Sequence, residues 1–152
     1  MSQIEQKIID LGFLLPETAK PLAAYIPAVQ SGNLVFTSGQ LPMIDGSLLE
    51  TGKVGGSVSP ERAKELATVC ALNALAAVKT VIGDLDKIKR IVKVVGFVSS
   101  TPDFSGQPAV VNGASEFLGE VFVDKGIHAR SAVGVAVLPL DAPVEIELIV
   151  EV

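Results

Sequence analysis

The strongest chemical signal in this sequence is Arg130, near the start of the C-terminal stretch HARSAVGVAVLPLDAPVEIELIVEV, residues 128–152. No lysine or other arginine follows it. A guanidinium stays ionised at any accessible pH, so burying it without a partner is costly. Two kinds of partner are open. Its planar fork fits the carboxylate of a ligand, and Glu145, Glu147 or Glu151 could form a structural ion pair with it.

Strand alternation sorts these side chains into faces. Arg130 shares its face with Ala132, Gly134 and Ala136, whose small size leaves space beside the guanidinium and favours a pocket. On the last strand, the three glutamates share one face. A solvated face is the simplest explanation for them, particularly for Glu151. The opposite face is apolar and carries Val144, Ile146, Leu148 and Val150.

Four other residues could contribute to a site, and each has a plain structural alternative. Tyr25, the only tyrosine, could line a ligand site or be a half-buried core residue. Asn112, within an apolar helix stripe, could contact a ligand or hold a loop. His128 lies in a connection and is expected to be exposed. Cys70, in the middle of a helix, is expected to be a small core residue and not a nucleophile.

Composition and motifs exclude several classes of function. The net charge of −5 and the pI of about 4.8 argue against sequence-independent binding to nucleic acid or anionic membranes. One cysteine allows no internal disulfide, and one histidine excludes a two-histidine metal site. Walker, GxGxxG, HExxH and GxSxG motifs are absent. The N-terminus has no signal-peptide pattern, and the apolar stretch 67–78 is too short to span a bilayer, so we expect a cytoplasmic protein.

The remaining pattern predicts one α+β domain over residues 1–152. A short amphipathic helix is expected within residues 2–12, and two strands flank a turn at residues 31–33. Residues 38–56 are expected to form a loop. Ser59, Pro60 and Gly83 bound a long helix. A strand within residues 86–100 follows, with Ile88, Ile91, Val95 and Phe97 directed to the core, then a second helix within residues 103–126. Two final strands, 129–137 and 144–152, are expected to pair as a hairpin.

The resulting order, β-β-α-β-α-β-β after an extra N-terminal helix, predicts a mixed sheet with two helices packed on one face. The basic cluster of residues 87–93 is expected to be the polar side of an edge strand. In the hairpin, Arg130 and Glu145 of one chain would lie about 20 Å apart, since a strand rises about 3.3 Å per residue. One small ligand could not contact both residues, so a site that uses them would be shared between chains.

Three stretches resemble the Rid family of reactive intermediate deaminases, also called the YjgF or L-PSP family. They are SGNLVFTSGQLP, VNGASEF and ARSAVGVAVLPLDAPVEIELIV, the last with the family's spacing from Arg130 to Glu145. The resemblance implies a chorismate-mutase-like subunit in a homotrimer, with ligand clefts between subunits and no cofactor or metal. It implies that Arg130 clamps a substrate carboxylate and Glu145 positions water. Tyr25 and Asn112 would shape the site.

The sequence departs from the family at Ala132, where many members carry a cysteine, so thiol chemistry is not expected at this substrate-binding position. The extra N-terminal helix and the longer loop from Asp45 to Gly56 indicate a divergent subgroup. The resemblance implies hydrolysis of enamines and imines such as 2-aminoacrylate to 2-oxo acids and ammonia. Two alternatives stay open: a non-catalytic binder of small carboxylates, and an endoribonuclease that inhibits translation, which the acidic charge and the single histidine fit less well.

Overall fold

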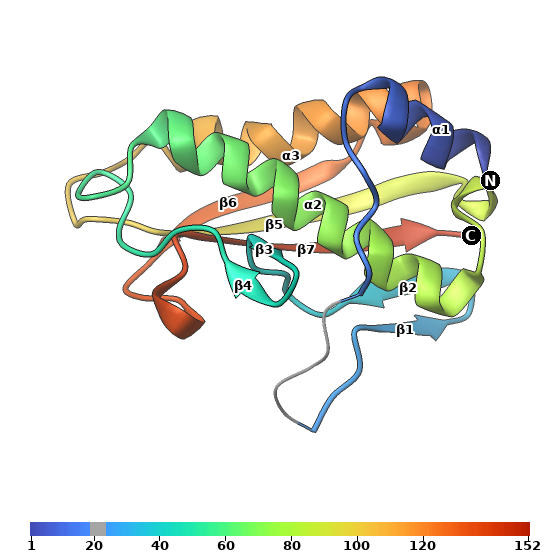
Figure 1. Cartoon of the computed structure of the whole chain (residues 1–152), viewed down its shortest axis with the longest axis horizontal. Helices are drawn as coiled ribbons and strands as arrows, with labels where there is room; N and C mark the ends of the chain where they lie inside the picture. Colours follow the sequence, from blue (N-terminus) through green and yellow to red (C-terminus); the bar gives the residue numbers. More distant parts are fainter. Residues whose placement is uncertain (19–23) are drawn as a thin grey trace.

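A five-stranded mixed sheet forms the centre of the protein (Figure 1). The computed structural model describes residues 1–18 and 24–152. The strands follow the spatial order β1-β2-β7-β5-β6. Their bounds are β1 Ala28–Ser31, β2 Leu34–Thr37, β5 Arg90–Ser99, β6 Ala129–Val135 and β7 Val144–Glu151.

The two C-terminal strands do not pair with each other, so the predicted hairpin is wrong. β5 lies between them, parallel to β6 and antiparallel to β7. The connection of residues 136–143 therefore crosses over β5, with a short 3-10 turn η3 at Pro139–Asp141. The sequence suggested that the basic residues near the start of β5 lie on an edge strand. This prediction is wrong, because β5 is an inner strand. The chain's own edges are β1 and β6.

Two helices, α2 (Pro60–Ile82) and α3 (Gln107–Phe122), lie side by side across one face of the sheet, as predicted (Figure 1). We call this the helix face and the other the open face. Ser59 caps α2 by accepting from the Arg62 amide at 3.1 Å, and Gly83 ends the helix with a positive φ. Both boundaries match the sequence pattern. α3 continues into a 3-10 turn η2, Val123–Gly126.

The predicted apolar stretch of residues 67–78 lies within α2, whose bounds match the expected helix. With 23 residues, α2 is long and apolar enough to span a bilayer by length and composition, but 67% of its most apolar window is buried inside the protein. Its residues pack on β7, β2 and α3. The apolar character of α2 is therefore explained by its place in the core.

A register shift in β5 changes which side chains reach that core. Between Ile91 and Lys93 the pairing with β7 slips by one residue, and a one-residue slip exchanges the two faces of a strand. Ile88 and Ile91 are buried as predicted, but Val95 and Phe97 are only half-buried on the open face. Val94 and Val98 take the core positions, with Gly96 between them beneath Val111 of α3.

The segment of residues 38–56 contains a small hairpin, where the sequence predicted only loop. β3 (Met43–Ile44) pairs with β4 (Ser47–Leu48) across Asp45 and Gly46, both with positive φ. An Asp-Gly pair suits this tight turn because such residues tolerate left-handed backbone. The side chain of Asn73 on α2 donates to the carbonyls of Leu41 and Met43 at 3.1 and 2.9 Å, which anchors the segment.

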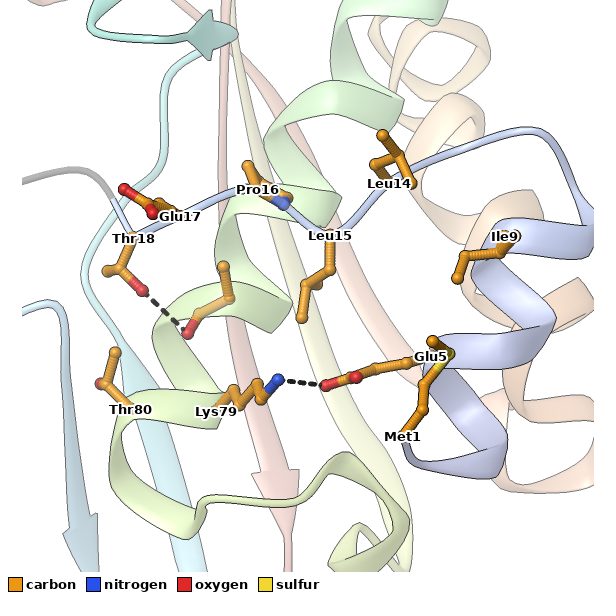
Figure 2. A pocket seen from close by; sticks show the side chains of 11 residues that line it. Met1, Glu5, Ile9, Leu14, Leu15, Pro16, Glu17, Thr18, Lys79 and Thr80 are labelled. Atoms are coloured by element: carbon orange, nitrogen blue, oxygen red, sulfur yellow. Dashed lines mark hydrogen bonds and ion pairs between the residues drawn. The ribbon is translucent and has the colours of Figure 1, made fainter.

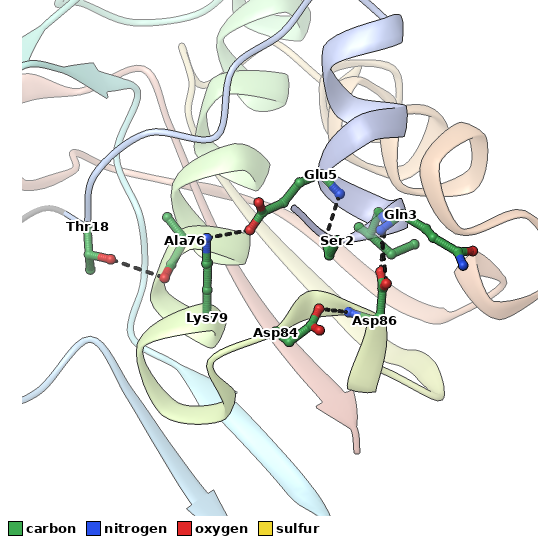
Figure 3. A network of polar contacts seen from close by, with 9 residues as sticks. Ser2, Gln3, Glu5, Thr18, Ala76, Lys79, Asp84 and Asp86 are labelled. Atoms are coloured by element: carbon green, nitrogen blue, oxygen red, sulfur yellow. Dashed lines mark hydrogen bonds and ion pairs between the residues drawn. The ribbon is translucent and has the colours of Figure 1, made fainter.

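The N-terminal helix α1 (Gln3–Asp10) is held by polar contacts at its start (Figure 3). Ser2 caps it, and the Asp86 carboxylate accepts from the amides of Ile4 and Gln3, each at 2.9 Å. These two donors lower the pKa of Asp86. Asp86 lies in a 3-10 turn η1, Leu85–Lys87. Ile8 of α1 is fully buried. The predicted extra helix is thus an integral part of the fold.

Candidate functional site

Arg130 lies on the edge strand β6 and points to the helix face. Its backbone is in register with Val94, a core position of β5. Its Nη1 donates to Asn112 Oδ1 at 2.6 Å and lies 3.3 Å from Ser115 Oγ. Both partners belong to α3. The structure thus brings together Arg130 and Asn112, two of the residues singled out from sequence, and Arg130 is half-buried.

Arg130 forms no ion pair with any residue in ranges 1–18 and 24–152. The structural pair with Glu145, Glu147 or Glu151 is therefore not formed in this chain. The two Nη1 hydrogens point to Asn112 and Ser115, while Nε and Nη2 have no hydrogen-bond partner within the same described ranges. These two groups form one edge of the guanidinium, with the parallel donors that a carboxylate accepts.

Small residues follow Arg130 on the helix face of β6. Ala132 and Gly134 follow it on the helix face of β6, in register with Gly96 and Val98. Ala132 packs against the core. At Gly134, an added Cβ would lie 2.8 Å from Gln107 Nε2. The predicted sharing of one face with Arg130 is confirmed for Ala132 and Gly134, whereas Ala136 lies beyond the end of β6.

Two residues that sequence reasoning did not place in the site lie behind Arg130. Ser115 contacts Arg130 and also His128, whose Nε2 is 2.9 Å from Ser115 Oγ. His128 is half-buried, where the sequence predicted an exposed side chain. It is held by a contact of 2.6 Å between Nδ1 and the Gly126 carbonyl. The spacing of Asn112 and Ser115, three residues apart on one helix, was the signal that could have revealed Ser115.

Glu145, near the start of β7, lies on the open face. It is in register with Phe97 of β5, whereas its neighbours Val144 and Ile146 are buried on the helix face. Its carboxylate packs on Gly39, where an added Cβ would be 2.5 Å from Oε1. Burial raises the pKa of Glu145, and the negative charge of Glu147 raises it further. A raised pKa suits a group that exchanges protons.

Within one chain, Arg130 and Glu145 do not meet. Their partners on β5, Val94 and Phe97, are three residues apart, and two strand spacings separate β6 from β7. These intervals give about 14 Å between the Cα atoms. The side chains also point to opposite faces of the sheet. The separation expected from sequence is thus present, although its reason is the position of β5 and not a hairpin.

Tyr25 is also remote from Arg130 within the chain. It precedes β1, at the sheet edge opposite β6, and is exposed. Four strand spacings of about 4.8 Å separate β1 from β6. One chain therefore does not bring Tyr25, Arg130 and Glu145 together.

Cys70 occupies the core, as predicted. It is fully buried, with Sγ 3.7 Å from the Val144 carbonyl oxygen. Burial raises the pKa of the thiol well above its usual value, so the reactive thiolate is disfavoured.

A cavity lies away from Arg130, between the N-terminal segment and α2 (Figure 2). It measures about 550 Å³, and two of its charged residues, Glu5 and Lys79, form an ion pair with each other. In the described part of the chain, no three His, Cys, Asp or Glu side chains are grouped as metal ligands. Neither feature involves the residues around Arg130.

Comparison with known proteins places these findings in a family. The family model described as "YjgF/chorismate_mutase-like, putative endoribonuclease" matches residues 5–152. Protein TCP17 of Trypanosoma cruzi is 43% identical over 142 residues, which are 93% of this chain and 89% of that protein. The 2-iminobutanoate/2-iminopropanoate deaminase of Escherichia coli K12 is 36% identical over 130 residues, with coverages of 84% and 87%.

A solved structure shares the whole architecture. Atu1372 of Agrobacterium tumefaciens, a protein of unknown function, superimposes with a TM-score of 0.92 at 48% identity, covering 98% of this chain and 92% of that one. The mixed sheet with two helices on one face is the arrangement these relatives share. By sequence and by fold, the chain belongs to the YjgF family, whose members include named imine deaminases.

Proposed function

We propose that this protein hydrolyses short-lived enamines and imines of the 2-aminoacrylate type to 2-oxo acids and ammonia. The observation that carries the proposal is the guanidinium of the half-buried residue Arg130, which has no carboxylate partner in the described chain and a free edge at Nε and Nη2. A small imino acid has one constant charged group, its carboxylate, and this edge matches it. Relatives named as imine deaminases support the same reaction.

The chemistry requires a bound carboxylate, a proton and a water molecule. With the substrate carboxylate on Arg130, a proton adds to the terminal carbon of the enamine and gives the imine. Water then adds to the imine carbon, and the bond from carbon to nitrogen breaks to release ammonia and the 2-oxo acid. Glu145, whose pKa is raised by burial, is suited to orient the water and to exchange the protons.

This mechanism needs Glu145 from a second chain, so the proposal includes a homotrimer with sites between subunits. Apolar residues on the open face support such an assembly. Val29, Phe36 and Val133 are 50%, 37% and 43% exposed, and strand register places all three on the same face as Glu145. A second copy packed on this face would bury them and bring new side chains to Glu145.

Two other functions fit the same observations less completely. A non-catalytic binder of small carboxylates would use Arg130 in the same way but would not need a glutamate with a raised pKa. Endoribonuclease activity, which the family's description mentions, would require an anionic RNA to bind a chain of net charge −5. Its acid-base chemistry would also depend on one histidine already hydrogen-bonded to Gly126 and Ser115.

The test is hydrolysis of 2-aminoacrylate generated in the assay from serine by a dehydratase. Purified protein should accelerate the release of pyruvate above the spontaneous rate, and Arg130→Ala should abolish the acceleration while remaining folded. Loss of one such charged contact commonly costs about 2 to 5 kcal/mol. Arg62→Ala is the matched control, since Arg62 pairs with Glu50 and Glu65 at the surface. Near-normal activity in Arg130→Ala would refute the proposal, and binding of pyruvate without turnover would favour the binder.

A further inference from the structure

A chain of three hydrogen bonds leads from a backbone carbonyl to the guanidinium of Arg130. The Gly126 carbonyl contacts His128 Nδ1 at 2.6 Å, and His128 Nε2 contacts Ser115 Oγ at 2.9 Å. Ser115 Oγ then lies 3.3 Å from Arg130 Nη1, which also donates to Asn112 at 2.6 Å. The members come from η2, from the connection between η2 and β6 that holds His128, from β6 and from α3.

The chemistry of the groups fixes the direction of each bond. A carbonyl oxygen only accepts, so His128 must carry its hydrogen on Nδ1. In the neutral imidazole, Nε2 is then an acceptor, and the Ser115 hydroxyl must donate to it. A hydroxyl has a single hydrogen, so the Ser115 oxygen faces Arg130 with its lone pairs only. The backbone carbonyl of Gly126 thus determines that Ser115 is an acceptor for Nη1.

We propose that Ser115 and His128 are positioning residues for Arg130. The inference rests on the carboxylate-binding role of Arg130 under the proposed function. With Asn112 and Ser115 accepting both Nη1 hydrogens, the guanidinium plane is fixed and the Nε and Nη2 edge faces the ligand. Without His128, the Ser115 hydroxyl can rotate and direct its hydrogen at Nη1, where two donors oppose each other. The guanidinium then loses a fixed orientation, and the carboxylate loses one or both parallel hydrogen bonds.

The same geometry argues against a reacting role for Ser115. It lies on the Nη1 side of the guanidinium, away from the edge that would hold the substrate. In many enzymes, a serine hydrogen-bonded to a histidine is the nucleophile. In this protein, Ser115 and His128 hold the guanidinium of Arg130 on its Nη1 side.

Two readouts test the proposal. His128 is the only histidine, so a long-range proton-nitrogen NMR spectrum of the imidazole reports its tautomer without ambiguity. The Nδ1–H form is expected at a pH where the ring is neutral, and the Nε2–H form would overturn the proposal. The second readout is the dissociation constant for pyruvate. Ser115→Ala and His128→Leu should weaken binding on the order of tenfold, the effect of one hydrogen bond to a charged group.

Conservative and control variants separate positioning from general damage. His128→Gln retains an acceptor near the position of Nε2 and should keep most of the affinity, with turnover affected through KM more than kcat. Thr68→Val removes a hydroxyl that donates to the Gly113 carbonyl at 2.9 Å, so it perturbs α3 without touching Arg130. It should lower stability and leave pyruvate binding unchanged. Wild-type affinity in folded Ser115→Ala would refute the positioning role.

Failure of the proposed function would be recognised separately. If the wild type neither binds pyruvate nor hydrolyses 2-aminoacrylate, nitrogen relaxation of the Arg130 Nε–H group decides the positioning role. A rigid Nε–H group in the wild type and in His128→Gln, but a mobile one in Ser115→Ala and His128→Leu, supports it. Equal mobility in all four proteins refutes it.

Discussion

Arg130 and Glu145 lie on opposite faces of one sheet, with their backbones attached to the two sides of the same strand, β5. Arg130 contacts α3 on the helix face, and Glu145 packs on Gly39 at the open face. No rotation of the two side chains can bring them together through a hydrogen-bonded sheet. A reaction that uses both residues therefore requires two chains, so the proposed mechanism depends on how the chains assemble.

The first prediction is that two inactive variants restore activity when they are mixed. Arg130→Ala and Glu145→Ala proteins are unfolded, refolded together and assayed with 2-aminoacrylate. In mixed oligomers, some clefts receive an intact arginine from one chain and an intact glutamate from another, so part of the activity should return. Native mass spectrometry confirms that mixed oligomers have formed.

The control for mixing uses two residues that meet within one chain. Arg130 and Asn112 are hydrogen-bonded at 2.6 Å, so no cleft in a mixture of Arg130→Ala and Asn112→Ala contains both intact. This mixture should show only the average activity of its parents. If the arginine and glutamate variants also stay at that average while mixed oligomers are present, the shared site is wrong.

Local sequence signals predicted the elements well, because their causes lie within a few residues of each other. Ser59 and Gly83 bound α2 as expected, since a cap and a left-handed glycine act on the adjacent turn. The face shared by Arg130, Ala132 and Gly134 also followed from alternation. The placement of β6 and β7 did not follow, because a hairpin and a crossover can join strands through the same short connection.

Two further differences have long-range causes. The register shift near Val92 depends on how β5 pairs with β7, and the residue types at that point do not predict it. His128 is half-buried because it contacts Ser115 of α3. This contact joins two segments that are separate in the sequence. Site geometry was therefore predictable where one strand or one helix determines it, and unpredictable where two elements meet.

The second prediction concerns pH and Glu145. Burial first, and the charge of Glu147 second, raise its pKa above the ordinary value of 4.5, so the folded chain holds this proton more tightly than the unfolded chain does. Stability should decrease as pH rises from the ordinary pKa through the raised one. Glu145→Gln removes this loss. Thermal unfolding should show the variant above the wild type at neutral pH, with the difference vanishing below the ordinary pKa.

NMR titration of the Glu145 carboxyl carbon provides the independent check. Glu147→Gln removes the second cause, so it should lower the pKa of Glu145 without restoring the ordinary value. A wild-type pKa at or below 4.5, or a Glu145→Gln advantage that grows toward acid pH, would contradict this account.

The third prediction is that Cys70 contributes to packing alone. Cys70→Ala removes a fully buried sulfur beneath β7 and should lower the free energy of unfolding by about 1 kcal/mol, less than truncation of a larger core residue. Activity at a temperature where the variant is folded should match the wild type. Chemical denaturation and the 2-aminoacrylate assay measure the two effects, and lost activity in folded Cys70→Ala would show a catalytic role.

The last prediction uses a glycine to move Glu145 without replacing it. A Cβ at Gly39 would lie 2.5 Å from Glu145 Oε1 and 2.7 Å from Cδ. The carboxylate is the flexible end of its side chain, so we expect it to shift while the backbone stays. Gly39→Ala should therefore remain folded but lose activity as severely as Glu145→Gln, because a water molecule held by the carboxylate would be displaced from the imine carbon.

Gly119→Ala is the matched control. An added Cβ at Gly119 has nothing within 4 Å, and alanine in a helix is more favourable by about 1 kcal/mol. This variant should be more stable and fully active. If Gly39→Ala is as active as Gly119→Ala, the position of the Glu145 carboxylate does not limit the reaction, and another group must hold the water.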